Sequence, residues 1–230
     1  MSDDPRIGEG FRHVHTPWLV GCAREFAWRC RADAAKQGFP ETQAGISAIL
    51  FAAIGVEAFF NELTAETEAL ARRDPILARL RDALIQAEEE RARIELKFIV
   101  ACMATGRAVD RGAEPFQGLD LLVDLRNAIA HVRSYEHAVA EDGRVDSEPR
   151  KLLARLFARR LIADPGRHPV EMFMSVVGTP EAAEWSVATA QATIDYVIDG
   201  LQDEHSRELC LFHFSSKRFG KLASDRGAKD

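Results

Sequence analysis

The sequence lacks the motifs that identify most catalytic classes. No His-Glu-x-x-His, Glu-x-x-His, Walker glycine loop or Gly-x-Ser-x-Gly occurs among the 230 residues. These absences argue against metalloproteases, di-iron bundles, P-loop nucleotide hydrolases and serine hydrolases. His13 and His15 are two residues apart, but no third ligand is spaced to complete a metal site with them. We therefore expect no metal site and no cofactor.

Paired cysteines, a secretion signal and a long hydrophobic run are also missing. The first ten residues have no basic start followed by an apolar stretch, so no secretory signal is expected. The most apolar segment, Ala44–Val56, ends at Glu57 and is too short to span a bilayer. The four cysteines form no Cys-x-x-Cys pair, which favours a reduced, cytoplasmic protein: Cys22, Cys30, Cys102 and Cys210.

Positive charge is in short supply as well. The net charge is −6 and the pI is near 5.7, which argues against a protein that coats nucleic acid non-specifically. Hydrophobic residues make up 47% and charged residues 29% of the chain, as in an ordinary globular protein. We expect one domain over residues 1–205 and a partly disordered tail over residues 206–230.

Strand signals are almost absent, because hardly any stretch alternates apolar and polar residues between turns. Only Val170–Val177 is equally compatible with a strand and a helix. Three Thr/Asp-Pro pairs, Thr16-Pro17, Asp74-Pro75 and Thr179-Pro180, are typical helix starts. They predict an all-α bundle, with helices near Pro17–Lys36, Glu41–Leu63, Pro75–Thr105, Arg150–Ile162 and Pro180–Gln202. The helix near Glu41–Leu63 is apolar almost all round and should be central.

A further amphipathic helix is predicted over residues 116–133, and it gathers the groups best suited to chemistry. Its apolar stripe consists of Leu122, Leu125, Ile129 and Val132. Asn127 and His131 are four residues apart and share an exposed line, with Arg126 at its edge. Ala128 and Ala130 are small enough to let a second surface approach closely.

The pattern Arg126-Asn127-x-x-x-His131 resembles the signature of the HEPN superfamily, named for higher-eukaryote and prokaryote nucleotide-binding proteins. That signature is an Arg followed by a polar residue and, four to six residues later, a His. Arg207–His213 and Arg6–His13 also satisfy the loose spacing. Only Arg126–His131 combines it with a polar neighbour and a long amphipathic helix.

The resemblance extends to the apolar central helix. Ala52–Leu63 contains Glu57 and Asn61, similar to a Glu-Ala-x-x-Asn pattern that precedes the signature in HEPN proteins. Lys97 is similar to a lysine on a helix between these two segments. The similarity covers about Glu41–Arg133.

Several expectations follow from the resemblance alone. It implies a HEPN-like helical bundle with extra N-terminal and C-terminal helices. It implies a metal-independent endoribonuclease with RNA as substrate, in toxin–antitoxin, phage-defence or RNA-processing roles. It also implies a homodimer through the signature helix, and it leaves room for an antitoxin or effector partner. Its reaction would be attack of a ribose 2′-OH on the adjacent phosphate.

Each candidate residue has a catalytic and a purely structural interpretation. His131 suits general acid–base catalysis, because imidazole titrates near neutral pH, but a histidine near a helix C-terminus is also favoured by the helix dipole. The guanidinium of Arg126 could bind and stabilise the oxygens of a phosphate. Alternatively, it forms an ion pair with Asp120, Asp124 or Glu57. Asn127 would orient His131, cap a neighbouring helix or face water.

Glu57 and Asn61 lie on one face of the apolar helix and are interpreted as supporting residues of the site. A carboxylate in such a helix needs a partner, and we predict Arg126. Lys151, Arg155 and Arg159 form a basic line that would contact RNA phosphates or simply face water.

Two other functional classes remain compatible with the sequence. One is a non-catalytic HEPN protein that binds RNA, a nucleotide or a partner without cutting. The other is a helical interaction protein in which the Arg-Asn-x-x-x-His pattern arises by coincidence.

Overall fold

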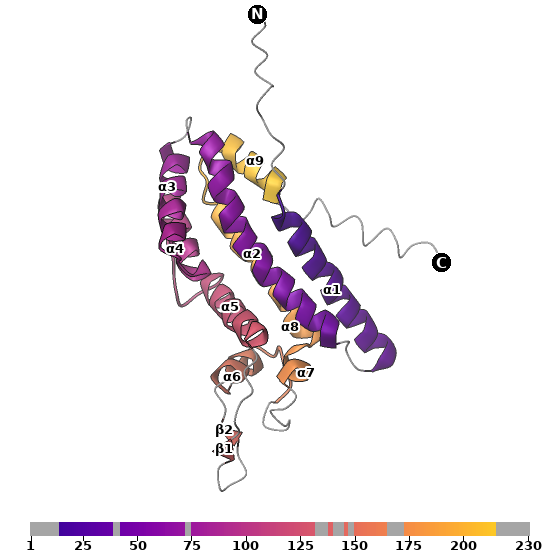
Figure 1. The fold of residues 1–230 in the computed structure, drawn as a ribbon. Coiled ribbons are helices and arrows are strands. Elements are labelled where there is room, and N and C mark those ends of the chain that lie inside the picture. The colour runs from indigo at the N-terminus through magenta and orange to yellow at the C-terminus, as the bar shows by residue number, and fades with distance from the viewer. Residues whose placement is uncertain are drawn as a thin grey trace, which may run out of the picture.

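The computed structural model describes residues 14–38, 42–71, 75–131, 138–139, 145–146, 150–164 and 173–214. Within them the chain is helical apart from two short paired strands, β1 (Ala138–Val139) and β2 (Val145–Asp146). The helices are α1 (Thr16–Gln37), α2 (Thr42–Leu70), α3 (Pro75–Glu89), α4 (Ile94–Ala104), α5 (Phe116–Ala130), α6 (Arg150–Ala158), α7 (Phe173–Val177), α8 (Pro180–Ile198) and α9 (Glu204–Phe214). The predicted all-α bundle is confirmed (Figure 1).

Helix α2 is the centre of the bundle, as predicted. It packs against α1, α3, α4, α5, α7 and α8, and Figure 1 shows it between α1 and α5 with α8 behind it. Its buried face reads Ala48, Ala52, Val56, Phe59 and Leu63, at the spacing of one helical face. The small residues at the start of this face let α1 and α8 approach closely.

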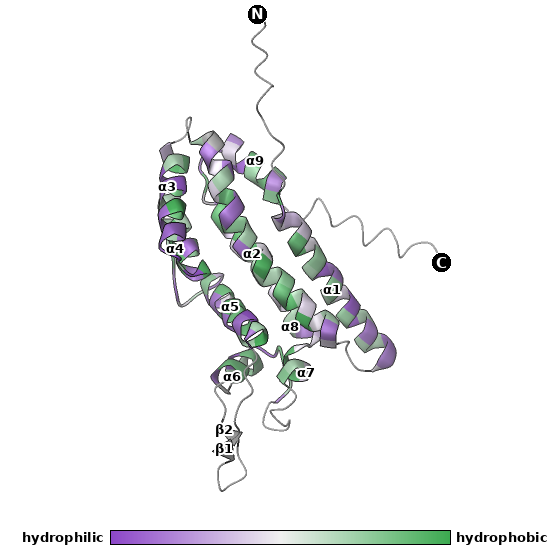
Figure 2. Cartoon of the chain, viewed as in Figure 1, coloured by the Kyte–Doolittle hydropathy of each residue, from purple (hydrophilic) through white to green (hydrophobic). Residues whose placement is uncertain are grey.

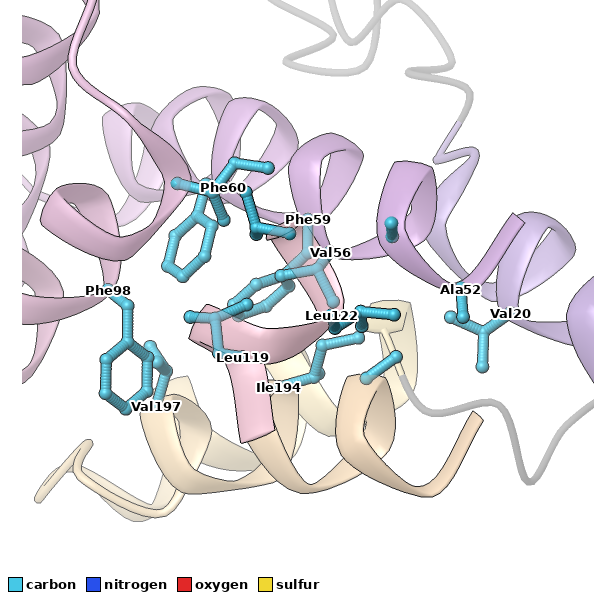
Figure 3. Packing of buried hydrophobic residues seen from close by; sticks show 14 of the residues in the cluster. Val20, Ala52, Val56, Phe59, Phe60, Phe98, Leu119, Leu122, Ile194 and Val197 are labelled. Atoms are coloured by element: carbon cyan, nitrogen blue, oxygen red, sulfur yellow. The ribbon is translucent and has the colours of Figure 1, made fainter. Parts of the chain in front are cut away.

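The core is built where α2, α4, α5 and α8 meet. Phe59 and Phe60 of α2 are fully buried there (Figure 3). They belong to one cluster with Leu122 of α5, Ile194 of α8 and Phe98 of α4. Truncating a buried phenylalanine of this kind typically costs about 3–5 kcal/mol, so this cluster fixes the position of α5 against α2.

The apolar part of α2 is longer than the sequence suggested. Helix α2 continues past Glu57 and past the predicted end at Leu63 to Leu70, and in this extension the hydroxyls of Thr64 and Thr67 donate to carbonyls of the preceding turn. Its segment Thr42–Glu68 is long and apolar enough to cross a membrane by length and composition, and Figure 2 shows the hydrophobic middle of α2. The core helix of a bundle meets the same criterion.

The start of α1 differs from its prediction. Thr16 does not cap the helix through its side chain; the N-cap is His15, which makes no side-chain capping bond. Instead the carboxylate of Glu62 on α2 accepts bonds from the backbone N–H groups of His15 and Thr16, at 2.5 and 3.0 Å. The hydroxyl of Thr16 donates to the same carboxylate at 2.6 Å. A negative charge from a neighbouring helix therefore satisfies this N-terminus.

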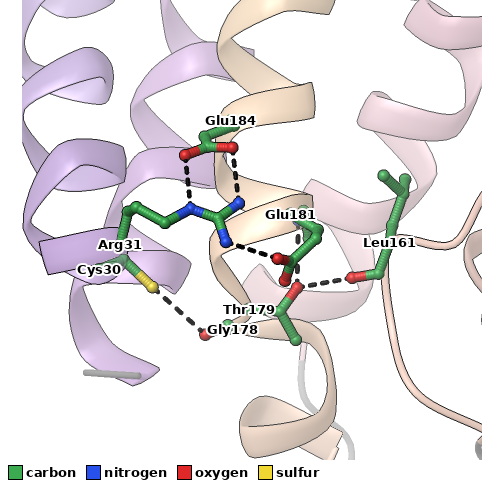
Figure 4. Close-up of polar contacts among 8 residues, drawn as sticks. Cys30, Arg31, Leu161, Gly178, Thr179, Glu181 and Glu184 are labelled. Atoms are coloured by element: carbon green, nitrogen blue, oxygen red, sulfur yellow. Dashed lines mark hydrogen bonds and ion pairs between the residues drawn. The ribbon is translucent and has the colours of Figure 1, made fainter. Parts of the chain in front are cut away.

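The start of α8 follows its prediction. The hydroxyl oxygen of Thr179 accepts a bond from the N–H of Ala182 at 3.1 Å, as an N-cap residue should. The same hydroxyl donates to the carbonyl of Leu161 at 2.6 Å (Figure 4). One side chain thus caps α8 and ties it to the segment after α6.

Two arginines end helices where the sequence predicted continuation. Arg91 has φ 52° and Arg160 has φ 60°, both in the left-handed region. The N–H of Ala92 bonds to Ala87 and that of Leu161 to Leu156, so both turns have the Schellman pattern. The predicted helix Pro75–Thr105 is therefore wrong and consists of α3 and α4. Likewise, α6 ends at Ala158 instead of Ile162. Neither turn contains the glycine that usually signals such an end.

The C-terminal part of the chain contains more helix than expected. Val170–Val177, compatible with either structure, contains the helix α7; residues 170–172 lie outside the described residues. Helix α8 ends at Ile198, a turn before the predicted end at Gln202. Helix α9 spans the expected domain limit at residue 205 and buries Cys210 and Phe214 in the core.

Arg31 fastens α1 to the first turns of α8. Its Nε and Nη2 donate to the two carboxylate oxygens of Glu184 at 2.8 and 2.7 Å. Its Nη1 donates to Glu181 at 2.7 Å, so the whole guanidinium edge is used (Figure 4). The bonds from Arg31 lower the pKa of Glu184 below its usual value.

This arrangement predicts a specific acid sensitivity. A carboxylate with a lowered pKa stabilises the fold above the pKa of a free glutamate, about 4.3, and the contribution is lost as pH falls through the folded-state value. We expect Glu184→Gln to reduce the free energy of unfolding at neutral pH by up to about 1 kcal/mol, because the groups are half exposed. Urea unfolding should show this loss at neutral pH and little difference below pH about 3.

The matched control is Glu25→Gln, which breaks only an exposed pair with Arg29 one turn away. That change should cost only about 0.3–0.5 kcal/mol. Equal costs for the two variants at neutral pH would contradict a special role for the Arg31 fork.

Candidate functional site

Helix α5 places the predicted site residues at one edge of its buried face. Leu122, Leu125 and Ile129 are buried, which confirms the predicted apolar stripe; Val132 lies outside the described residues. Arg126 and Asn127 are half-buried beside this stripe. The core packing of α5 therefore presents both polar side chains at the seam with α2.

The predicted ion pair between Glu57 and Arg126 is confirmed. Nη2 of Arg126 donates to Oε2 of Glu57 at 2.6 Å. The reason given for it was partly wrong, because the Glu57 side chain is 41% exposed and not enclosed in the core. The pair lies at the border between α2 and α5, where the Arg126 side chain is 27% exposed.

Asn127 supports Arg126 instead of His131. Its Oδ1 accepts a bond from Nη1 of Arg126 at 2.9 Å. The guanidinium is thus held from two sides, by Glu57 of α2 and by Asn127 of its own helix. A guanidinium has five N–H donors, and these two contacts use two of them. Arg126 is therefore held in place, and within the described part of the chain its other N–H donors have no bond partner.

His131 lies just beyond the end of α5, one turn after Asn127. It is the C-cap residue, with φ −114° and ψ 45°, and its N–H bonds to the carbonyl of Asn127 at 2.9 Å. The residue is exposed, and no side chain in the described part of the chain hydrogen-bonds its imidazole. The expected Asn127–His131 hydrogen bond is therefore not formed. The imidazole is free to meet a ligand.

Asn61 lies one turn along α2 from Glu57 and takes part in a neighbouring contact. Its Oδ1 accepts a bond from Nζ of Lys97 at 3.1 Å, and Lys97 also pairs with Glu88 of α3. Lys97 is buried, at 8% exposure. Asn61 therefore helps to compensate a buried lysine where α2, α3 and α4 meet. Glu88 was not singled out from the sequence.

Two members of the predicted basic line already have partners inside the fold. Arg155 bonds Asp120 and Asp124 of α5 at 2.5 and 2.6 Å. Arg159 bonds Glu114 at 2.6 Å. RNA phosphates would have to displace these carboxylates. The pairing of Asp120 and Asp124 with Arg155 also leaves Glu57 as the acidic partner of Arg126.

No metal centre or reactive thiol adds to the site. Among the described residues, no three His, Cys, Asp or Glu side chains are grouped so that they could hold a metal ion. None of the four cysteines, all of which lie in described segments, forms a disulfide. Burial raises the pKa of the Cys102 and Cys210 thiols to about 12 each, so neither supplies a thiolate near neutral pH.

Comparisons of the chain with protein-family models, with curated proteins and with solved structures gave no match. Any function must therefore be argued from the residues themselves.

The site geometry predicts a measurable coupling between Glu57 and Arg126. In a double-mutant cycle with Glu57→Gln and Arg126→Gln, we expect a coupling of about 0.5–1 kcal/mol, because the contact is short but partly exposed. Chemical denaturation of the four proteins measures it. A coupling indistinguishable from zero, or one that survives in molar salt unchanged, would contradict a direct ion pair.

Proposed function

We propose that this chain is a metal-independent endoribonuclease of the HEPN kind. The observation that carries the proposal is the position of Arg126, which Glu57 and Asn127 hold at the border of α2 and α5 while its side chain stays 27% exposed. The exposed His131 follows Asn127 by one turn, at the C-cap of α5. A fixed guanidinium beside an exposed imidazole suits phosphoryl transfer, which needs charge stabilisation and proton transfer.

In the proposed reaction the ribose 2′-oxygen attacks the adjacent phosphorus. The 2′-OH proton passes to a neutral imidazole of His131 as the new P–O bond forms. The bond from phosphorus to the 5′-oxygen then breaks, and that oxygen takes a proton from an imidazolium. The products are a 2′,3′-cyclic phosphate and a free 5′-OH. Arg126 stabilises the extra negative charge on the non-bridging oxygens, because its fork matches their geometry.

A homodimer would complete this site. In an in-line displacement the attacking 2′-oxygen and the leaving 5′-oxygen lie on opposite sides of phosphorus, so two separate imidazoles serve better as base and acid than one. A two-fold axis beside α5 would supply a second Arg126 and a second His131. Ala128 and Ala130 at this end of α5 favour close approach of a partner. We propose that the enzyme acts in the cytoplasm, in a toxin or phage-defence role. An antitoxin would inhibit it by covering Arg126 and His131.

A second candidate function is a non-catalytic RNA- or nucleotide-binding or interaction protein. The specific observation in its favour is that Asn127 bonds Arg126, so no described side chain orients the imidazole of His131. In such a protein Arg126 would still bind a phosphate, but His131 would have no chemical role.

RNA cleavage in the presence of EDTA distinguishes the two candidates. We expect the wild-type protein to cut RNA under these conditions and to leave cyclic-phosphate ends. Arg126→Ala and His131→Ala should each lower the rate by about 10²–10⁴-fold, because each removes charge stabilisation or proton transfer. Matched controls are Arg29→Ala and His205→Ala, which remove exposed side chains on α1 and α9. RNA binding without any cleavage would favour the second candidate.

A shared site predicts complementation between inactive subunits. Mixing Arg126→Ala with His131→Ala protein gives heterodimers that still hold one Arg126 and one His131. Their activity should exceed that of either variant alone, with wild-type circular dichroism as a check on folding. A protein that is monomeric at working concentration, or a mixture no more active than its parts, would contradict the shared site.

A further inference from the structure

The hydrogen bonds around Asn61 fix which way its amide is turned. An ammonium group only donates hydrogen bonds, so the atom that Asn61 presents to Nζ of Lys97, 3.1 Å away, is its carbonyl oxygen Oδ1. Lys97 is buried and is itself held by the carboxylate of Glu88. The amide nitrogen Nδ2 of Asn61 is therefore turned away from Lys97, and no acceptor among the described residues binds it.

An unused acceptor lies one helical turn away. Glu57 and Asn61 are four residues apart on α2, so their side chains are neighbours. Oε2 of Glu57 accepts the bond from Arg126, whereas Oε1 has no partner in the described part of the chain. Asn61 is exposed and Glu57 is 41% exposed. The two side chains thus present a donor and an acceptor next to the guanidinium that Glu57 binds.

We propose that Glu57 and Asn61 read the base of the nucleotide whose phosphate binds Arg126, and that this base is guanine. The inference rests on the proposed function and adds substrate specificity to the same site. Proteins read single-stranded RNA through hydrogen bonds to the Watson–Crick edges of its bases. On that edge guanine carries the carbonyl O6 beside two N–H donors, N1–H and N2–H. The carbonyl accepts from Nδ2 of Asn61, and the two donors suit the carboxylate of Glu57.

The other bases fit this pair of side chains less well when the phosphate fixes the direction of the nucleotide. In adenine and cytosine an amino group replaces the carbonyl and an unprotonated nitrogen replaces the N–H, so donor meets donor and acceptor meets acceptor. Uracil keeps the carbonyl and the N–H but has a second carbonyl in place of the N2 amino group. Guanine alone gives the carboxylate two donors, and hydrogen bonds to a charged group are the stronger kind.

Lys97 acts on the base only through Asn61. It is a positioning residue, because its ammonium determines that Asn61 turns a donor, and not an acceptor, toward the nucleotide. Glu88 compensates the charge of the buried lysine. A buried ion pair with no direct contact to the substrate therefore contributes to the choice of base.

The test measures the binding of pentanucleotides that differ only in their central base, between uridines, and whose 2′-hydroxyl groups are methylated so that they cannot be cut. We expect wild-type protein to prefer guanine over adenine. Asn61→Asp keeps an acceptor for Lys97 but removes the donor, so the ratio of the two affinities should fall about tenfold, as for one lost contact to a base edge. Lys97→Met, checked for folding by circular dichroism, should lower the same ratio. The matched control Gln202→Glu changes an exposed amide in the same way and should leave the ratio unchanged.

The outcomes separate this inference from the function beneath it. If wild-type protein binds these RNAs and Arg126→Ala weakens binding, but guanine and adenine bind equally, the base-reading role is wrong and the site at Arg126 stands. A guanine preference that Asn61→Asp leaves intact would overturn the inference as well, because another part of the chain would then read the base. If wild-type protein binds none of the RNAs, the inference and the proposed function both fail.

Discussion

The bundle depends on the burial of α2, the long apolar helix against which most of the others pack. Its small residues admit α1 and α8, and its phenylalanines fix α4 and α5. Because so much of its circumference is apolar, its few charged positions are strongly constrained. Glu62 serves the N-terminus of α1, and Glu57 meets Arg126 at the border with α5. These two carboxylates of α2 thus lie at its borders with other helices, where they accept hydrogen bonds from the N–H groups of α1 and from the guanidinium of α5.

The candidate site is a consequence of that constraint. Core packing of α5 fixes where Arg126 emerges, and Glu57 with Asn127 fixes how its guanidinium is turned. The Arg126 side chain remains 27% exposed there. Arg155 shows the contrast, because two aspartates bind its fork. The two arginines differ in the charge of their partners, because two carboxylates bind Arg155, whereas one carboxylate and one neutral amide bind Arg126.

Much of this arrangement was predictable from the sequence, and the failures have physical causes. The apolar stripe of α5 and the Thr179 cap follow from periodicity and capping chemistry. The Glu57–Arg126 pair was predicted from the cost of burying a lone carboxylate and does form, although Glu57 is partly exposed. The break at Arg91 did not, because a non-glycine residue in the left-handed region leaves no local signal. The partners of Arg155 depend on how α6 docks, which no local pattern encodes. Asn127 was expected to bond His131 but bonds Arg126, because its position on the helix is close to both residues.

The central proposal is that an RNA phosphate binds Arg126 and leaves the ion pairs of Arg155 and Arg159 with their carboxylates intact. Nitrogen-detected NMR of the arginine side chains tests it most directly, during titration with a short single-stranded RNA whose 2′-hydroxyl groups are methylated so that it cannot be cut. The account predicts that the Arg126 Nε resonance shifts and saturates while those of Arg155 and Arg159 remain in place. An unmoved Arg126 resonance, or saturating shifts at Arg155 and Arg159 instead, would contradict it.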